Sequence, residues 1–311
     1  MGKITAVCIS KKRGTKKNMV QSAYLREGWG IEGDAHAGDW HRQVSLLSVE
    51  KIEAFREKGA EVDFGDFGEN LVVEGYDLRT VPVGTKLRVG EALLEITQIG
   101  KECHSHCEIY KAMGDCIMPR EGIFAKVLKS GTACPGDEAV LLPAEPCRPF
   151  TAAAITLSDK GAAGEREDKS GVLLKELLAG HGYEVVETLL LADDQPLLEH
   201  HLRRLADQRQ VNVIFTTGGT GFSRRDITPE ATLAVCDRMA DGIAQAIRQY
   251  SLAITGRAML SRAVSGIRGG TLIVNLPGSP KAVRESLECI LPHLGHGLGI
   301  LRGTDGECGQ A

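Results

Sequence analysis

The sequence of 311 residues lacks the features that define several special classes of protein. It has no apolar run near the ~18 residues that a membrane-spanning helix needs, so we expect no membrane partner. Its formal net charge is only −4, which does not favour binding to nucleic acid. The first residues, MGKITAVCIS, lack the basic and apolar regions of a secretory signal. We therefore predict a cytoplasmic location.

The nine cysteines are an odd number, which does not suit a framework of paired disulfides. Free thiols in a reducing compartment are the better interpretation. Only Cys103, Cys107 and Cys116 lie close together in the sequence. We expect the other cysteines to be packing residues.

The length of the chain favours two domains, at the usual ~100–200 residues each. Hydrophobic residues make up 42% and charged residues 25%, as in ordinary globular proteins. The composition changes near residue 145, where the proline-rich segment LLPAEPCRPF (141–150) is predicted to be extended and free of helix. We interpret it as a linker between domains at 1–145 and 146–311.

Short apolar runs alternate with glycine-rich turns before the linker, which predicts a mostly-β barrel or sandwich. A hairpin is expected at 89–92 (VGEA). One helix is predicted from Ser48 to Lys58, with Ser48 as its N-cap and Gly59 as its stop. The expected strands include 4–10, 44–49, 70–75, 86–90 and 92–100.

Strand and helix patterns alternate after the linker, which predicts a parallel sheet covered by helices on both faces. The helix at 228–239 is expected to begin with Thr228 as its cap. The helix at 169–180 is expected to carry one apolar side, formed by Val172, Leu173, Leu177 and Leu178. The remaining elements are strands at 150–158, 183–191, 211–219 and 271–278, and helices at 195–207 and from Ser279.

A glycine-rich segment, TTGGTGFSRRD (216–226), follows one of these buried strands. Glycine lets the backbone approach a ligand closely and expose its N–H groups, which suits phosphate. The segment is not a P-loop, because it lacks Gly-Lys-Ser/Thr, and it is not a G-x-G-x-x-G fingerprint, because Arg224 occupies the third glycine position. A plain glycine-rich turn is the alternative interpretation.

Two more polar segments follow strands. In NLPGSPKAV (275–283), Ser279 caps a helix whose free N–H groups either favour an anion or serve only the cap. The segment 158–171 follows the first strand of this half. Because ligands of open α/β sheets bind beyond the carboxyl ends of the strands, we expect these loops to converge on one crevice.

Adjacent aspartates end the segment LADD (191–194). Their side chains diverge, so one can enter the crevice while the other caps the next helix. Together with Asp226, Asp193 can hold Mg²⁺, a hard cation that takes oxygen ligands and bridges phosphates. The alternative is that each aspartate is a solvated turn residue.

In combination, these motifs resemble those of the molybdopterin adenylyltransferase family. SD…DKSG, LADD, TTGGTGFSRRDITPEAT and NLPGSPKAV follow the family's order and spacing over roughly 150–302. A further segment resembles the family through Ser261, Arg262, Gly266 and Arg268. The resemblance implies a three-layer α/β/α fold, a trimer, and activation of molybdopterin by MgATP with release of pyrophosphate.

The resemblance also implies roles for individual residues. Asp193 and Asp226 would bind Mg²⁺ and position phosphates for in-line attack. A phosphate cradle would be formed by Gly218, Gly219, Thr220 and Gly221. The pocket would be completed by Ser158, Asp159, Asp168, Ser261, Gly278 and Ser279.

The first half resembles a MOSC domain, a module related to the C-terminal part of molybdenum-cofactor sulfurases, over roughly 1–143. The resemblance rests on GDAHAGDWHRQVS (33–45), GENL (68–71), GTKLRVGEALLEITQI (84–99), GKECHSHC (100–107) and PREGIFAKVLKSGTACPGDEAVLL (119–142). It implies a β-barrel in which Cys103 carries sulfur, without a pyridoxal cofactor, or contacts the molybdenum cofactor. The neighbouring Lys101 and His104 would lower the pKa of this thiol.

Other interpretations of the first half stay open. Zinc could be ligated by Cys103, His104, His106, Cys107 and Cys116, or these residues could be inert. A pocket for an anionic ligand, or only a turn, could be formed by Asp34, His36, His41 and Arg42. A basic loop, either solvated or steering a phosphate-bearing pterin, comprises Lys11, Lys12, Arg13, Lys16 and Lys17.

Both resemblances point to the same cofactor. We predict a transferase of molybdenum cofactor biosynthesis that adenylylates molybdopterin with ATP and Mg²⁺, and whose N-terminal domain binds, sulfurates or passes on the cofactor. The expected partners are a metal-insertion protein, molybdoenzymes and further copies of the chain. The alternative is a non-catalytic carrier or storage protein for a molybdenum or tungsten cofactor or oxyanion.

Overall fold

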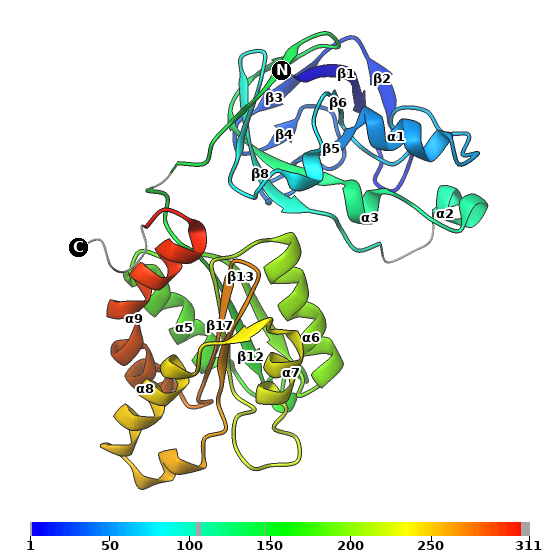
Figure 1. Ribbon diagram of the computed structural model, residues 1–311. Coiled ribbons are helices and arrows are strands. Elements are labelled where there is room, and N and C mark those ends of the chain that lie inside the picture. Colours follow the sequence, from blue (N-terminus) through cyan, green and yellow to red (C-terminus); the bar gives the residue numbers. More distant parts are fainter. Residues whose placement is uncertain (1, 104–106, 146, 306–311) are drawn as a thin grey trace. The chain divides into compact units, whose positions relative to one another are not determined.

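The computed structural model describes residues 2–103, 107–145 and 147–305, which form two compact units that divide after Glu145 (Figure 1). His104, His106 and Cys308, which entered the predictions above, lie outside the described residues. The cysteines within these ranges are free thiols, as predicted. Over the same ranges, no helix is both long and apolar enough to cross a membrane.

The N-terminal unit is a closed β-barrel. Its strand order is β11-β7-β8-β9-β5-β6-β1, with β2 beside β1, and antiparallel pairing of β1 with β11 closes the ring. The strands are β1 (Gly2–Ile9), β2 (Asn18–Val20), β5 (Val44–Ser48), β6 (Leu71–Glu74), β7 (Lys86–Val89), β8 (Ala92–Ile99), β9 (Ile123–Lys129) and β11 (Glu138–Leu142). A smaller sheet contains β3 (Ala23–Arg26), β4 (Gly30–Ile31) and β10 (Gly131–Ala133). The predicted barrel and the hairpin at 89–92 are confirmed.

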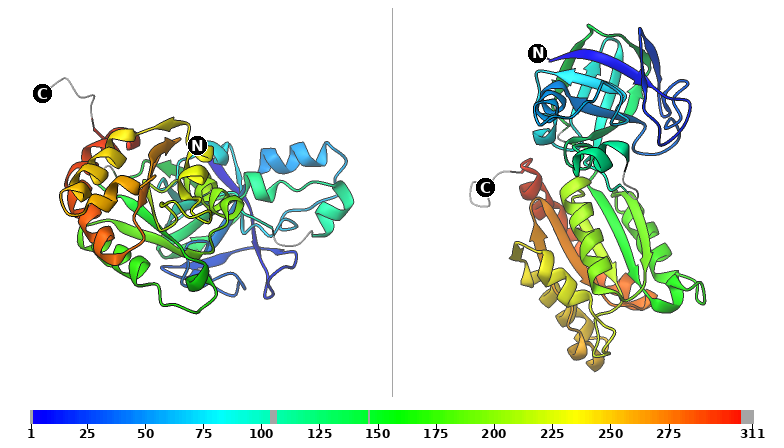
Figure 2. Two further views of the ribbon diagram at one scale, coloured as in Figure 1. Left: turned by 90° about the horizontal axis from the view of Figure 1, so that it is seen from below. Right: turned by 90° about the vertical axis from the view of Figure 1, so that its right-hand side faces the viewer.

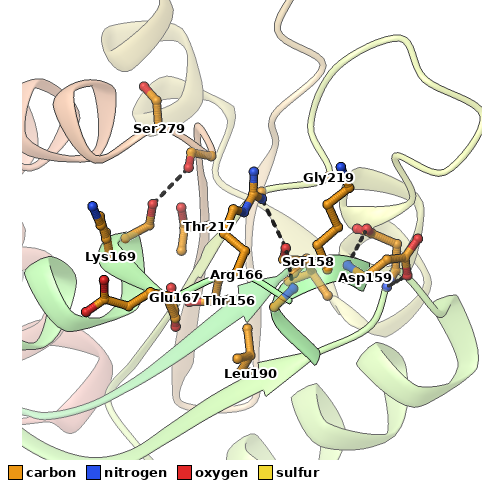
Figure 3. A pocket seen from close by; sticks show the side chains of 18 of the residues that line it. Thr156, Ser158, Asp159, Arg166, Glu167, Lys169, Leu190, Thr217, Gly219 and Ser279 are labelled. Carbon is orange, nitrogen blue, oxygen red and sulfur yellow. Dashed lines mark hydrogen bonds between the residues drawn. The ribbon is translucent and has the colours of Figure 1, made fainter. Parts of the chain in front are cut away.

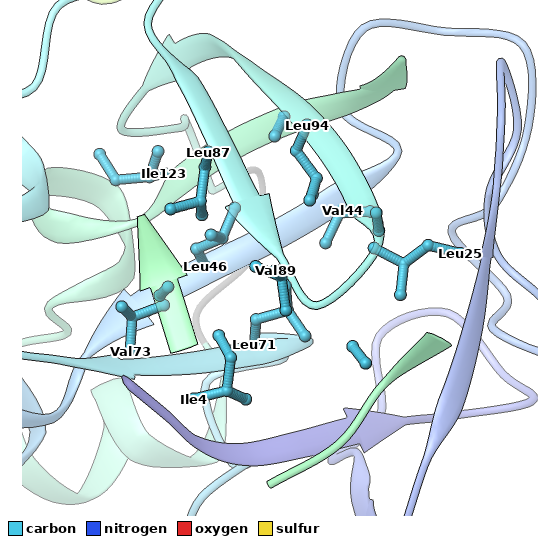
Figure 4. Packing of buried hydrophobic residues seen from close by; sticks show 14 of the residues in the cluster. Ile4, Leu25, Val44, Leu46, Leu71, Val73, Leu87, Val89, Leu94 and Ile123 are labelled. Atoms are coloured by element: carbon cyan, nitrogen blue, oxygen red, sulfur yellow. The ribbon is translucent and has the colours of Figure 1, made fainter. Parts of the chain in front are cut away.

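Side chains that alternate along the strands fill the barrel (Figure 4). In β6, Leu71 and Val73 belong to the inner cluster, while Val72 packs in a second cluster on the outside. This outer cluster lies under α1 (Val49–Arg56), α2 (Glu108–Met113) and α3 (Met118–Glu121). Ser48 occupies the N-cap position of α1 as predicted, but its side chain makes no capping hydrogen bond.

The C-terminal unit is built on a sheet of order β13-β12-β14-β17-β16-β15. The pairs from β13 to β17 are parallel, and β16 and β15 add antiparallel strands at one edge. The strands are β12 (Thr151–Leu157), β13 (Glu184–Leu191), β14 (Val213–Thr217), β15 (Arg238–Met239), β16 (Ser265–Arg268) and β17 (Thr271–Leu276). The parallel ladder places the carboxyl ends of four strands at the same edge of the sheet.

Helices cover both faces of this sheet (Figures 1 and 2). Along β12, Ala152 and Ala154 pack on the side of α5, α8 and α9, whereas Ala153 and Ile155 pack on the side of α6 and α7. The helices are α4 (Asp159–Ala162), α5 (Lys169–Gly180), α6 (Gln195–Arg203), α7 (Thr228–Val235), α8 (Asp241–Leu252) and α9 (Pro280–Arg302). Short helical segments lie at Leu78–Thr80 in the N-terminal unit and at Arg204–Gln208 and Gly256–Leu260 in the C-terminal unit.

Three local predictions differ from the structure. In α5, Leu174 and Leu178 are buried and Val172 is 54% exposed, because the apolar run fits two neighbouring helical phases and packing selects the other one. Thr228 does not cap α7: its hydroxyl donates to the carbonyl of Gly218 at 2.8 Å, and Ile227 occupies the cap position. The helix α7 ends at Val235 rather than at residue 239, because the chain continues into the strand β15.

Candidate active site

Polar loops at the carboxyl ends of the parallel strands enclose a pocket of about 1010 Å³ (Figure 3). The loops follow β12, β13, β14 and β17, as the alternating sequence pattern predicted. The predicted residues that line the pocket are Ser158, Asp159, Asp168, Asp193, Gly218, Gly219, Asp226, Gly278 and Ser279. Most of the residues singled out in the C-terminal half are therefore brought together.

Two glycines in the loop after β14 have left-handed backbone conformations, which favour glycine. Gly218 has φ 99° and Gly219 has φ 64°. A Cβ atom at Gly218 would lie 2.5 Å from the carbonyl oxygen of Leu157, and one at Gly278 would lie 3.2 Å from the Cα atom of Gly218. The backbones of the loops after β14 and β17 therefore approach each other closely. Because glycine has no side chain, this approach leaves room for a ligand.

Among the described residues, Thr220, Gly221 and Ser261 do not line this pocket. Thr220 and Gly221 instead present their carbonyl groups to Arg262, which donates from its backbone N–H at 3.0 Å and from Nε at 2.6 Å. The hydroxyl of Ser261 accepts the N–H of Ala263 at 3.3 Å. Arg262 therefore holds the glycine loop through its backbone. Sequence spacing alone does not distinguish this supporting role from direct contact with a ligand.

Several pocket residues cap helices. Ser158 accepts the N–H of Gly161 at 3.1 Å, and Asp168 accepts that of Gly171 at 2.8 Å. Ser279 caps the long helix α9 through the N–H of Ala282 at 3.3 Å. The N-termini of α4, α5 and α9 therefore lie beside one pocket, where the partial positive charge at the start of the longer helices α5 and α9 favours a negatively charged ligand.

Carboxylates gather at one end of the pocket. Burial raises the pKa of Asp193 above its ordinary value, and the negative charges of Asp159 and Asp226 raise it further. Oδ2 of Asp226 accepts the N–H of Ser223 at 2.9 Å, which orients that carboxylate. A cation beside Asp193 would favour its ionised form.

The donor atoms of Asp193 and Asp226 fit Mg²⁺, because they are hard oxygen ligands next to a phosphate-type cradle. Within the part of the chain that the structure describes, no three His, Cys, Asp or Glu side chains form a metal site. Mg²⁺ commonly takes one or two carboxylates and completes its shell with water and substrate phosphates. A pair of aspartates is therefore a sufficient protein contribution.

Sequence reasoning missed the cationic residues of the pocket, which are Lys160, Arg166 and Lys169. Arg166 donates to the hydroxyl of Ser158 at 3.1 Å and extends among the pocket residues (Figure 3). The hydroxyls of Thr217 and Ser170 were also missed; they donate to the carbonyls of Pro277 and Gly278 at 2.7 and 2.9 Å. The charged segment between β12 and α5 was the feature of the sequence from which the cationic residues could have been predicted.

In the N-terminal unit, Asp34 and Lys17 form a buried ion pair. Their charged atoms are 2.9 Å apart, and the side chains are 1% and 0% exposed. Asp34 also accepts the N–H groups of Ser10 and His36, at 3.0 and 2.9 Å. The prediction that Lys17 belongs to a solvated basic loop was therefore wrong, and Asp34 is a structural anchor rather than a ligand contact. Lys11 to Lys16 are exposed.

The other predicted residues of this unit lie near the end of β8. The guanidinium of Arg42 stacks 4.8 Å from the ring centre of Trp40 and 5.6 Å from that of Phe124. His41 shares a hydrogen bond of 2.8 Å with Gln98, near the end of β8. Cys103 follows β8 and is exposed, whereas Cys116 is buried and its pKa is raised to about 11, chiefly by burial.

A polar pocket edged by glycines and helix N-termini, beyond the ends of parallel strands, is typical of α/β proteins that bind phosphorylated ligands. Comparison with known proteins indicates which family within this class the chain resembles. Residues 153–296 match the family model described as a probable molybdopterin binding domain, and residues 33–140 match the MOSC domain model.

Curated relatives match the C-terminal half of the chain. Over 152 residues it is 39% identical to the molybdopterin adenylyltransferase of Helicobacter pylori, covering 48% of this chain and 86% of that protein. It is 43% identical to that of Escherichia coli over 137 residues, covering 43% and 70%. A crystal structure of the molybdopterin biosynthesis enzyme MoaB from Thermus thermophilus shares 47% identity and a TM-score of 0.48, covering 50% and 97%. Through this half, the chain belongs to the molybdopterin adenylyltransferase family, and a MOSC domain precedes it.

Proposed function

We propose that the C-terminal unit transfers the adenylyl group of ATP to molybdopterin with release of pyrophosphate. One observation carries the proposal: Asp193 and Asp226 line the same pocket as the glycine loop at Gly218 and Gly219. The names of the relatives support the identity of the substrate.

Adenylyl transfer forms a bond between a substrate oxygen and the α-phosphorus of ATP and breaks the bond from that phosphorus to the bridging oxygen of pyrophosphate. Such a reaction depends on alignment and on neutralisation of charge. The backbone N–H of Gly219 and the positive N-terminal end of α9 would hold phosphate oxygens. Lys160, Arg166 and Lys169 would balance further negative charge.

Asp193 and Asp226 are the residues that would hold Mg²⁺. Bound there, the ion would neutralise charge on the phosphates during the transfer. The burial of Asp193 beside two other carboxylates supports this assignment, because its ionised form gains most from a nearby cation.

For the N-terminal unit we propose binding, sulfuration or transfer of the maturing cofactor. Support comes from the end of β8, where the stacked Arg42 and Trp40 present a cation and an aromatic ring. The guanidinium suits an anionic group such as the phosphate of a pterin. Cys103, exposed a few residues beyond β8, would carry the sulfur.

The proposal is tested by incubating the purified chain with molybdopterin, ATP and Mg²⁺ and measuring pyrophosphate. We expect release that requires the pterin and that is lost in Asp226→Asn, whose amide oxygen can still accept the N–H of Ser223. Wild-type turnover in that variant would refute the site. Tight binding of the pterin without release of pyrophosphate would refute the proposed enzymatic activity and favour a carrier of the cofactor.

A further inference from the structure

An ion pair beside the pocket joins loops that follow two different strands. Arg225 belongs to the loop after β14, and Asp159 is the first residue of α4, just after β12. Nε of Arg225 lies 3.0 Å from Oδ2 of Asp159, and a terminal nitrogen lies 2.6 and 2.7 Å from Oδ1 and Oδ2. In this forked geometry, a guanidinium fixes the orientation of a carboxylate as well as balancing its charge.

The same aspartate also holds the loop after β13. Oδ1 of Asp159 accepts the N–H of Asp193 at 3.0 Å, and the N–H of Asp159 donates to Oδ2 of Asp193 at 3.4 Å. Asp159 therefore contacts both the backbone and the carboxylate of Asp193. Through Asp159, Arg225 is linked to the first of the two aspartates assigned to the metal.

The second aspartate is anchored from the other side of the loop. Arg262 donates to the carbonyl groups of Gly221 and Asp226, at 2.6 Å each. Arg262 thus fixes the backbone that carries Asp226, while the neighbouring Arg225 ties that backbone to Asp159. The bond between Arg225 and Asp159 thus links the loop that carries Asp226 to the residue that contacts Asp193.

Stability alone does not account for this ion pair. The side chains of Arg225 and Asp159 are 62% and 43% exposed. Exposed pairs of this kind contribute little to the free energy of folding. The consequence of the pair therefore lies in geometry, because it connects three loops that border one pocket.

We propose that Arg225 is a positioning residue that acts through Asp159 to set the placement of Asp193 relative to Asp226. The inference rests on the proposed function for the identity of the reaction. The arrangement itself concerns residues of this chain and can be measured without turnover.

The first measurement is the affinity of the full-length chain for Mn²⁺ in the presence of a non-hydrolysable ATP analogue, read from the electron paramagnetic resonance of free Mn²⁺. We expect Arg225→Ala and Asp159→Asn each to raise the dissociation constant by about 10-fold, as is usual when a group that orients a metal ligand is lost. Arg225→Lys should recover part of the affinity, because lysine keeps the charge but not the fork. Arg224→Ala is the matched control: it removes the same charge from an exposed neighbour in the same loop and should change nothing.

The double variant Arg225→Ala/Asp159→Asn should bind Mn²⁺ no more weakly than either single variant, because both substitutions break the same link. The second measurement is the pyrophosphate assay, in which Arg225→Ala should lower kcat by roughly 10- to 100-fold and leave KM for molybdopterin unchanged. Equal thermal midpoints would establish that the variants are folded.

The inference is overturned if Arg225→Ala binds Mn²⁺ as Arg224→Ala does, or if the two single losses multiply in the double variant. Failure of the proposed function looks different. In that case the wild-type chain releases no pyrophosphate, while the expected order of Mn²⁺ affinities still holds among the variants.

Discussion

Asp193 and Asp194 are neighbours in the chain but have different contacts. Asp194 accepts the N–H of Leu197 at 2.9 Å and so caps α6, whereas Asp193 lines the pocket. Adjacent residues in extended backbone point their side chains apart. This is why the two aspartates of LADD supply one carboxylate that caps a helix and one that lines the pocket.

This difference gives the first prediction. Asp193→Asn should abolish pyrophosphate release with little change in thermal midpoint, because the amide keeps its size but loses its charge. Asp194→Asn is the matched control and should be active, since asparagine caps helices as well as aspartate does. Asp194→Ala should cost about 1 kcal/mol of stability, measured by urea unfolding. Equal activity in the two asparagine variants would contradict the assignment of Asp193.

The second prediction concerns the glycine loop. Gly218→Ala would place a Cβ atom 2.5 Å from the backbone oxygen of Leu157, at φ 99°. We expect a loss of roughly 1–3 kcal/mol in the free energy of unfolding, together with a large loss of activity. Gly242→Ala, at the start of α8 where the new Cβ meets open space, is the control and should be neutral or slightly stabilising. Full activity in Gly218→Ala would show that the close approach is not required.

The third prediction compares two adjacent lysines. Lys17→Met removes one partner of the buried pair and should destabilise the N-terminal unit by roughly 3–5 kcal/mol, because it leaves the Asp34 charge buried. Lys16→Met breaks an exposed contact with Asp66 and should cost only ~0–1 kcal/mol. Denaturant unfolding of both variants makes the comparison, and similar losses would argue against the buried pair.

The same pair predicts a dependence on pH. Burial raises the pKa of Asp34, but hydrogen bonds from His36 and the charge of Lys17 outweigh it and hold the pKa well below its usual range. As the pH falls below the ordinary value of ~4, the unfolded chain takes up the proton before the folded chain does, so stability is lost. This acid sensitivity should be weaker in Asp34→Asn, when unfolding is followed between pH 5 and pH 2 (roughly the range in which aspartates titrate). If the free energy of unfolding of Asp34→Asn depended on pH as steeply as that of the wild-type chain, the prediction would be contradicted.

The crevice could be predicted from sequence because its parts are local. Each loop follows an apolar strand, and glycine or a capping residue marks where the strand ends, as at Gly218 and Ser279. Parallel pairing then brings the loops to one edge. The same local logic distinguished the two adjacent aspartates before the structure placed them.

The features that could not be predicted from the sequence depend on tertiary contacts. Thr228 follows every local rule for a helix cap, yet its hydroxyl bonds to Gly218, ten residues earlier. Lys17 ends a basic run but pairs with Asp34 inside the barrel. Arg166 belongs to a charged run that resembles solvated surface, and it turns into the pocket through Ser158. Such contacts depend on tertiary packing, which spacing along the chain does not encode.

The ladder between β1 and β11 places Gly2 opposite Ala139 and Lys3 opposite Glu138. The chain thus enters and leaves the barrel through neighbouring strands, which makes this unit suited to grafting into a surface loop of another protein. The same pairing limits how far this unit can be shortened at its C-terminal end. Because β11 pairs with β7 as well as with β1, a cut ahead of Glu138 would leave two bare strand edges, each a template for aggregation.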